Sequence, residues 1–120
     1  MRWDPQSRIA LLRFESETRA TGEDAVVLIE ALTHWIGTDG DSFGLLGDGS
    51  RLASVDAGYR AAWGSFFRRH REDACIAFFN MGPVIRIAAE MFRIGTGLRL
   101  KAFATELEAR AWLQGMMIAA

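Results

Sequence analysis

The chain has 120 residues, of which half are hydrophobic and about a quarter are charged, a composition that fits one ordinary globular domain and excludes a disordered chain. Fourteen basic side chains face fifteen acidic ones, so the domain lacks the positive field with which nucleic-acid-binding proteins neutralise phosphates. The sequence has a single cysteine, no apolar run long enough for a membrane span and no apolar signal-peptide core after Met1. These features together predict a cytoplasmic protein.

The N-terminal third of the chain predicts a hairpin followed by a helix. Residues 3–15 combine a turn around Pro5 with a mostly apolar strand. A helix is expected over residues 23–36, where apolar side chains recur at helical spacing. Thr21 stands three residues before Asp24, which is a capping-box spacing for the start of that helix.

The middle of the chain predicts two strands and two helices. Residues 43–46 read as a short strand, and Ser54 is a suitable N-cap for the following helix. Residues 73–79 are almost continuously apolar, as in a strand that is covered on both faces, and Pro83 suits the first turn of the next helix. The side chains of these two helices that are expected to face the core are Tyr59, Ala62, Trp63, Phe66, Phe67, Val84, Ile87, Ala88, Met91 and Ile94.

The C-terminal part predicts one more strand and a last helix. Residues 98–103 alternate in polarity, which is typical of a strand near a sheet edge. Thr105 and Glu108 have the spacing of a second capping box. The apolar face of the last helix is expected to consist of Leu107, Ala111, Trp112 and Met116.

This order of elements predicts an α/β fold in a single domain over residues 1–120. Strands that alternate with helices pair in parallel through right-handed crossovers. We therefore expect a mixed, mostly parallel sheet of about five strands with four helices, and an antiparallel edge strand contributed by the N-terminal hairpin.

Three segments carry a resemblance to a known family: residues 43–50 (Phe-Gly-Leu-Leu-Gly-Asp-Gly-Ser), residues 59–62 (Tyr-Arg-Ala-Ala) and residues 101–113, a strand followed by a capping box and Glu-Ala-Arg-Ala-Trp-Leu. In this pattern the chain resembles the SpoIIAA-like proteins of the STAS superfamily over nearly its whole length. The resemblance implies a STAS-like fold and a bacterial regulatory protein. The SpoIIAA-like branch is commonly compared with lipid-binding folds of the SEC14 type, which implies a small hydrophobic ligand.

The anti-sigma-factor antagonists of that superfamily are phosphorylated on a Ser or Thr just before a loop glycine. Aligning this glycine on Gly58 places Val55-Asp56-Ala57 before it, with no hydroxyl at the key position. Ser50 and Ser54 lie further upstream and would be unorthodox phosphorylation sites. The departure from the family pattern puts a phosphorylation switch in doubt.

A binding site is expected where strands end and helices begin, because ligands of open parallel sheets bind beyond the carboxyl ends of the strands. The same residues would serve equally as caps and turns of the fold, and the aromatic ones as core, pocket wall or dimer face. The residues predicted to bind a ligand or partner are Asp48, Gly49, Ser50, Ser54, Asp56, Tyr59, Trp63, Asn80, Met81 and Gly82.

No combination of residues in the sequence fixes a reaction. His34 and His70, with one cysteine, give no metal-ligand spacing and no nucleophile–base pair. The sequence therefore predicts a non-enzymatic regulatory or ligand-binding module without metal or cofactor, whose ligand is a small apolar molecule. The alternative is a signalling domain of the anti-sigma-factor-antagonist type that binds a regulatory protein, and a homodimer is compatible with both hypotheses.

Overall fold

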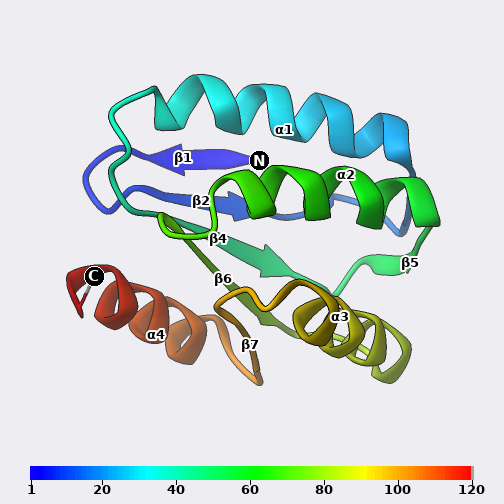
Figure 1. Ribbon diagram of the computed structural model, residues 1–120. Coiled ribbons are helices and arrows are strands. Elements are labelled where there is room, and N and C mark those ends of the chain that lie inside the picture. Colours follow the sequence, from blue (N-terminus) through cyan, green and yellow to red (C-terminus); the bar gives the residue numbers. More distant parts are fainter. Residues whose placement is uncertain (120) are drawn as a thin grey trace.

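A central sheet of five strands in the order β1-β2-β4-β6-β7 organises the computed structural model, which describes residues 1–119 (Figure 1). The strands are β1 (Arg2–Asp4), β2 (Ile9–Leu12), β4 (Phe43–Asp48), β6 (Ala74–Phe79) and β7 (Leu100–Phe103). β1 pairs with β2 in antiparallel orientation and the other neighbours pair in parallel. The predicted α/β class, the mixed sheet and the antiparallel edge strand are confirmed.

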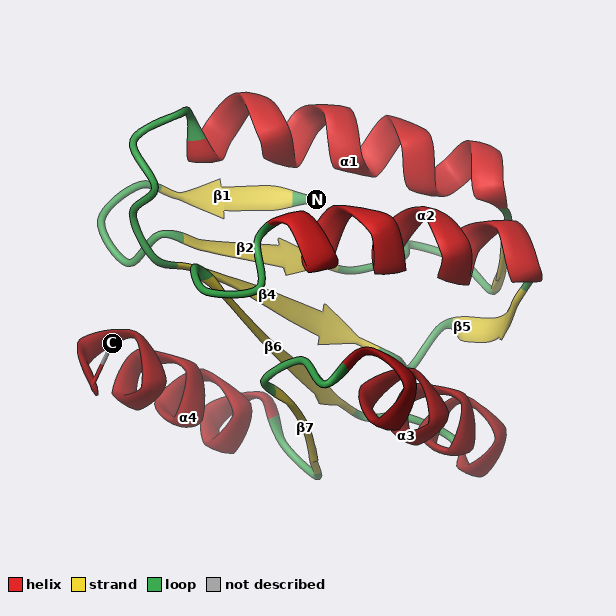
Figure 2. Ribbon diagram, in the orientation of Figure 1, coloured by secondary structure: helices red, strands yellow, loops and turns green. Residues whose placement is uncertain are grey.

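Four helices cover the sheet (Figure 2): α1 (Gly22–Ile36), α2 (Ala57–Arg69), α3 (Pro83–Thr96) and α4 (Glu106–Ala119). The larger hydrophobic cluster joins α1, α2 and part of α3 to one face of the sheet. The smaller cluster joins α4 to the other face through Ile9, Leu46, Cys75, Ala77, Phe79, Ala109 and Leu113. Because consecutive residues of a strand point to opposite faces, β4 and β6 contribute alternate side chains to the two clusters. Cys75 lies in the core, as expected.

Two short strands, β3 (Thr18–Ala20) and β5 (Leu52–Val55), pair in parallel beside the main sheet and were not predicted. Their presence corrects the expected role of Ser54, which belongs to β5. The N-cap of α2 is Asp56, whose Oδ1 accepts a hydrogen bond of 2.7 Å from the backbone N–H of Tyr59. A carboxylate caps a helix as well as a hydroxyl does, so pairing with β3 takes up the residues before Asp56 and the helix starts two residues later.

The capping box predicted at Thr21 is present, and the one predicted at Thr105 is present in part. The side chain of Thr21 accepts from the backbone N–H of Asp24, and the Asp24 carboxylate accepts from the backbone N–H of Thr21. At the start of α4, the Thr105 hydroxyl accepts from the backbone N–H of Glu108 and donates to its carboxylate. These short-range interactions satisfy helix N–H groups that have no partner within the helix.

The orientation predicted for α3 is wrong. Val84, Ile87, Met91 and Ile94 are between 63% and 72% exposed, whereas Ile85 is buried and Phe92 packs against the core. The two sets of side chains lie on different sides of one helix. Both sides of α3 carry large apolar side chains, so helical periodicity by itself does not say which side faces the sheet.

The face predicted for α4 also needs correction. Ala109 and Leu113, four residues apart, are fully buried, while Leu107 is 79% exposed and Ala111 is exposed. Trp112 and Met116 are half-buried at the border of this contact. A small residue at 109 lets the helix approach the sheet closely, which places Leu113 rather than Leu107 in the interior.

No helix within residues 1–119 is both long and apolar enough to cross a bilayer.

Candidate functional site

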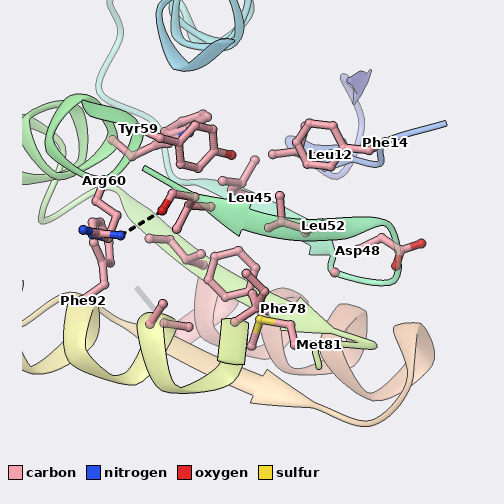
Figure 3. A pocket seen from close by; sticks show the side chains of 18 of the residues that line it. Leu12, Phe14, Leu45, Asp48, Leu52, Tyr59, Arg60, Phe78, Met81 and Phe92 are labelled. Atoms are coloured by element: carbon pink, nitrogen blue, oxygen red, sulfur yellow. Dashed lines mark hydrogen bonds between the residues drawn. The ribbon is translucent and has the colours of Figure 1, made fainter. Parts of the chain in front are cut away.

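An apolar cavity of about 90 Å³ lies between the sheet, α2 and α3 (Figure 3). The sheet side is formed by side chains of β2, β4 and β6, and β5 closes one end with Leu52 and Val55. Tyr59, Trp63 and Phe67 of α2 form a second wall. The third wall consists of the α3 side chains Ile85, Ala88, Ala89 and Phe92.

The wall formed by α2 is a packed aromatic cluster. The ring of Trp63 stacks on Phe67 with 5.4 Å between centroids and meets Tyr59 edge-on at 6.3 Å. Burial raises the pKa of the Tyr59 hydroxyl to about 12, so this group stays a neutral phenol. The Nε1–H of Trp63 is buried and has no hydrogen-bond partner among the described residues. Buried donors are nearly always paired, so this indole N–H stands out as an unsatisfied group of the wall, beside the Tyr59 hydroxyl whose pKa it lowers against the larger effect of burial.

The charged residues in the lining are Asp48 and Arg60, and each has a protein partner. Asp48 accepts a hydrogen bond of 2.9 Å from Nε of Arg13 and another of 2.9 Å from the backbone N–H of Ser50. Its carboxylate points away from the cavity (Figure 3). Arg60 donates to the backbone carbonyl of Val55 at 3.0 Å. Asp48 therefore has its counter-ion within the protein, whereas the exposed Arg60 guanidinium has a neutral carbonyl as its partner.

Asp48 belongs to a network that ties the end of β4 to β2 and α4. Arg13 bridges Asp48 and Glu106, and Glu106 also accepts from Arg110. Burial of Asp48 by itself would raise the pKa of the carboxyl, but the hydrogen bonds from Ser50 and Arg13 outweigh burial and hold the pKa below its usual value. Asp48 is thus a charged structural residue at the cavity edge.

The structure brings only part of the predicted site together. The predicted residues that line the cavity are Asp48, Gly49, Tyr59, Trp63 and Met81. Those that do not line it are Ser50, Ser54, Asp56, Asn80 and Gly82. Asn80 is exposed with a φ of 54°, the left-handed conformation that asparagine adopts readily in turns, and Gly82 is the N-cap residue of α3.

Sequence reasoning missed most of the apolar lining. Leu52 and Val55 lie on the unpredicted strand β5. The α3 wall was missed because the outward face of that helix was taken for its core face. Ile85, Ala89 and Phe92 do carry a signal, since their spacing of four and three residues places them on one side of a helix.

The remaining candidate groups lie apart from the cavity. Within residues 1–119, no three His, Cys, Asp or Glu side chains come together as a metal site. His34 is exposed, and His70 packs against Phe43 and Phe66, where burial lowers the pKa of its imidazole. At the start of α2, Gly58 packs on Gly22 of α1. A Cβ added to Gly22 would stand 3.3 Å from the backbone of Gly58. A structural contact between helices therefore explains the glycine that the family resemblance singled out.

No family model, curated protein or solved structure matches this chain. The resemblance to SpoIIAA-like proteins therefore stays a prediction.

Proposed function

We propose that this protein is a binding module for a small, uncharged, mostly apolar molecule, which occupies the cavity between α2, α3 and the sheet. The observation that carries the proposal is a cavity with an almost wholly apolar lining that also contains one buried donor without a partner, Nε1–H of Trp63. Ligand sites typically combine such an apolar wall with very few polar groups that orient the ligand.

The electrostatics of the lining select the charge of the ligand. Asp48 is neutralised by Arg13 and the Arg60 side chain is exposed to solvent, so an ion in the apolar interior of the cavity would lose its hydration without gaining a partner there. A neutral molecule loses little hydration. One acceptor atom on the ligand, such as a carbonyl oxygen, would satisfy the Trp63 indole and contribute about 0.5–1.5 kcal/mol.

The volume selects the size of the ligand. The cavity of about 90 Å³ is smaller than the engineered apolar cavity of about 150 Å³ that holds benzene. A short aliphatic chain or part of one ring therefore fits within it, with the remainder of the ligand at the mouth. At roughly 0.5 kcal/mol per non-hydrogen atom, a ligand of about nine atoms would bind with a Kd near 1 mM.

Acetophenone and ethylbenzene form a matched pair of probes, because they have similar shapes and differ in the carbonyl acceptor. The chain has four tryptophans, so an ¹⁵N-labelled sample gives four indole signals, and Trp63→Phe identifies the one that belongs to Trp63. We expect both probes to perturb the Trp63 signal. Acetophenone should bind about 2–10-fold more tightly than ethylbenzene. In Trp63→Phe, where binding is followed through the backbone amide signals of the cavity lining, the difference should disappear.

Ala89→Leu places extra side-chain volume in the cavity wall and should remove binding of both probes. Ala111→Leu introduces the same side chain at an exposed position of α4 and should leave binding unchanged. The proposal is wrong if neither probe shifts the Trp63 signal at about 5 mM, a concentration several times the expected Kd. It is also wrong if Ala89→Leu folds normally and binds both probes as the unaltered protein does.

A further inference from the structure

Helix α3 carries a second apolar face, which points away from the cavity. Val84, Ile87, Met91 and Ile94 are 72%, 63%, 69% and 68% exposed, and their spacing of three, four and three residues aligns them in one stripe along the helix. Single exposed apolar residues are common on protein surfaces, but a contiguous stripe of large ones marks an interaction surface. We call these four side chains the α3 stripe.

The two edges of the α3 stripe differ. Helical geometry places Arg86, Glu90 and Arg93 along one edge. Nε of Arg93 donates to both carboxylate oxygens of Glu90 at 3.1 Å, while Arg86 has no ion-pair partner among residues 1–119. The small residues Ala88 and Gly95 lie along the other edge, beside a groove against α2. Small residues at an edge let another helix approach closely.

We propose that the α3 stripe is the docking surface for a second copy of this chain, with the two α3 helices packed antiparallel about a two-fold axis. The stripe is complementary to itself in this arrangement. Val84 lies opposite the partner's Ile94, and Ile87 lies opposite the partner's Met91, so that all four side chains of each copy are covered. A two-fold interface requires such self-complementarity.

The charged edge supports the antiparallel direction. A two-fold axis brings the charged edge of one helix beside the charged edge of the other, and Arg86 then lies about two residues along the axis from the partner's Glu90. That offset is about 3 Å, within reach of an arginine side chain, and the pair forms twice. In a parallel two-fold arrangement the charged edge of each helix would instead face the small edge of the other, and Arg86 would have no carboxylate opposite it.

A membrane surface is the competing occupant of the stripe. Helices that lie on anionic lipid carry basic residues on their polar face, and Arg60 and Arg68 do line the groove beside the small edge. The carboxylate of Glu90 at the other edge, directly beside the apolar side chains, favours a protein partner that supplies an arginine. Four side chains from each copy form a small interface, so the dimer is a weak one, with a Kd of about 1–100 µM.

Sedimentation of the protein between about 1 and 500 µM, a range that brackets the expected Kd, tests the proposal. The unaltered protein should shift from monomer to dimer. Ile87→Asn combined with Met91→Gln should remain monomeric at every concentration. Val27→Asn, at a comparably exposed position of α1, should dimerise as the unaltered protein does. All three positions are exposed, so thermal unfolding should confirm that the variants remain folded.

A charge exchange tests the antiparallel register. Arg86→Glu alone and Glu90→Arg alone should each raise the dimer Kd about 10-fold or more, since each homodimer would contain two like-charged contacts. A one-to-one mixture of the two variants should form a heterodimer with an affinity close to that of the unaltered protein, because both contacts are again between opposite charges. A mixture that stays as weak as its components overturns the antiparallel arrangement.

Two outcomes overturn the proposal as a whole. One is a protein that remains monomeric throughout the concentration range, and the other is a dimer that persists in the Ile87→Asn, Met91→Gln variant. Vesicles of phosphatidylcholine with phosphatidylglycerol are the probe for the competing occupant. If a protein that is monomeric in solution sediments with these vesicles, and the double variant does not, the stripe is a lipid-binding surface instead.

Discussion

Gly47, near the end of β4, is the position where the structure makes the sharpest prediction. Its neighbour in the sheet is Phe78 on β6, and the Phe78 ring lies directly over the glycine. A Cβ at position 47 would stand 2.6 Å from Cδ1 and 2.8 Å from Cε1 of that ring. Real Cβ atoms essentially never stand within 3.0 Å of another atom, and ordinary contacts lie at 3.4–4 Å. The ring must therefore move if residue 47 has a side chain.

Gly47→Ala is therefore expected to lower the free energy of unfolding by about 1–3 kcal/mol, the usual cost of overpacking a well-packed interior. The ring can turn toward the cavity, which Phe78 also lines, so the variant should bind acetophenone more weakly as well. Urea unfolding monitored by circular dichroism measures the first effect, and the shift of the Trp63 indole signal measures the second.

Gly115→Ala is the matched control, because the structure leaves open space around that position in α4. Alanine there should stabilise the protein by up to about 1 kcal/mol through its helix propensity. Shortening the ring should relieve the clash at position 47, so Gly47→Ala should cost less in a Phe78→Leu background than in the unaltered protein. If Gly47→Ala changes stability by less than about 0.5 kcal/mol and leaves binding unaltered, the contact between the glycine and the ring is not as described.

Two further predictions concern the cavity edge and the face under α4. Asp48→Asn should lower stability by about 1–2 kcal/mol at neutral pH, since it removes the charge that accepts from Arg13 and Ser50. The pKa of Asp48 is lower in the folded than in the unfolded protein. The stabilisation by the Asp48 charge is therefore complete above the unfolded pKa of about 4 and disappears as the pH falls through the folded pKa. A stability difference between the unaltered protein and Asp48→Asn that stays constant in urea unfolding down to pH 2 would contradict this assignment. Leu113→Ala should cost about 2–5 kcal/mol in the same assay, because the side chain is fully buried against the sheet. Leu107→Ala, at an exposed position, should cost under about 0.5 kcal/mol. Equal effects of the two substitutions would mean that α4 packs through a different face.

The features that the sequence predicted well depend on neighbouring residues in the chain. Thr21 and Asp24 form a capping box, and Thr105 caps α4 beside Glu108. Each pair lies within one helical turn, so spacing alone identifies it. The parallel sheet follows from the alternation of strands and helices. Strand β5 escaped prediction because its four residues are stabilised by pairing with β3, more than thirty positions earlier, and local preference carries no information about that partner.

The candidate site was harder to predict because it depends on which way α3 faces. Periodicity identified an apolar stripe on that helix, but the helix has two, and the one with the larger side chains was assigned to the core. In the structure the inward face includes Ala88 and Ala89, while Ile87 and Met91 face outward. Burial of apolar area would by itself favour the reverse arrangement, with large residues inside and small ones outside.

The arrangement of α3 therefore costs stability on both of its faces. Small side chains on the inner face leave the cavity unfilled, and an unfilled cavity forgoes packing contacts that a larger residue would supply. Large apolar side chains on the outer face lose no hydration unless another surface covers them. Both costs are removed together if a ligand occupies the cavity and a second copy of the chain covers the stripe, which is why one helix supports both proposals.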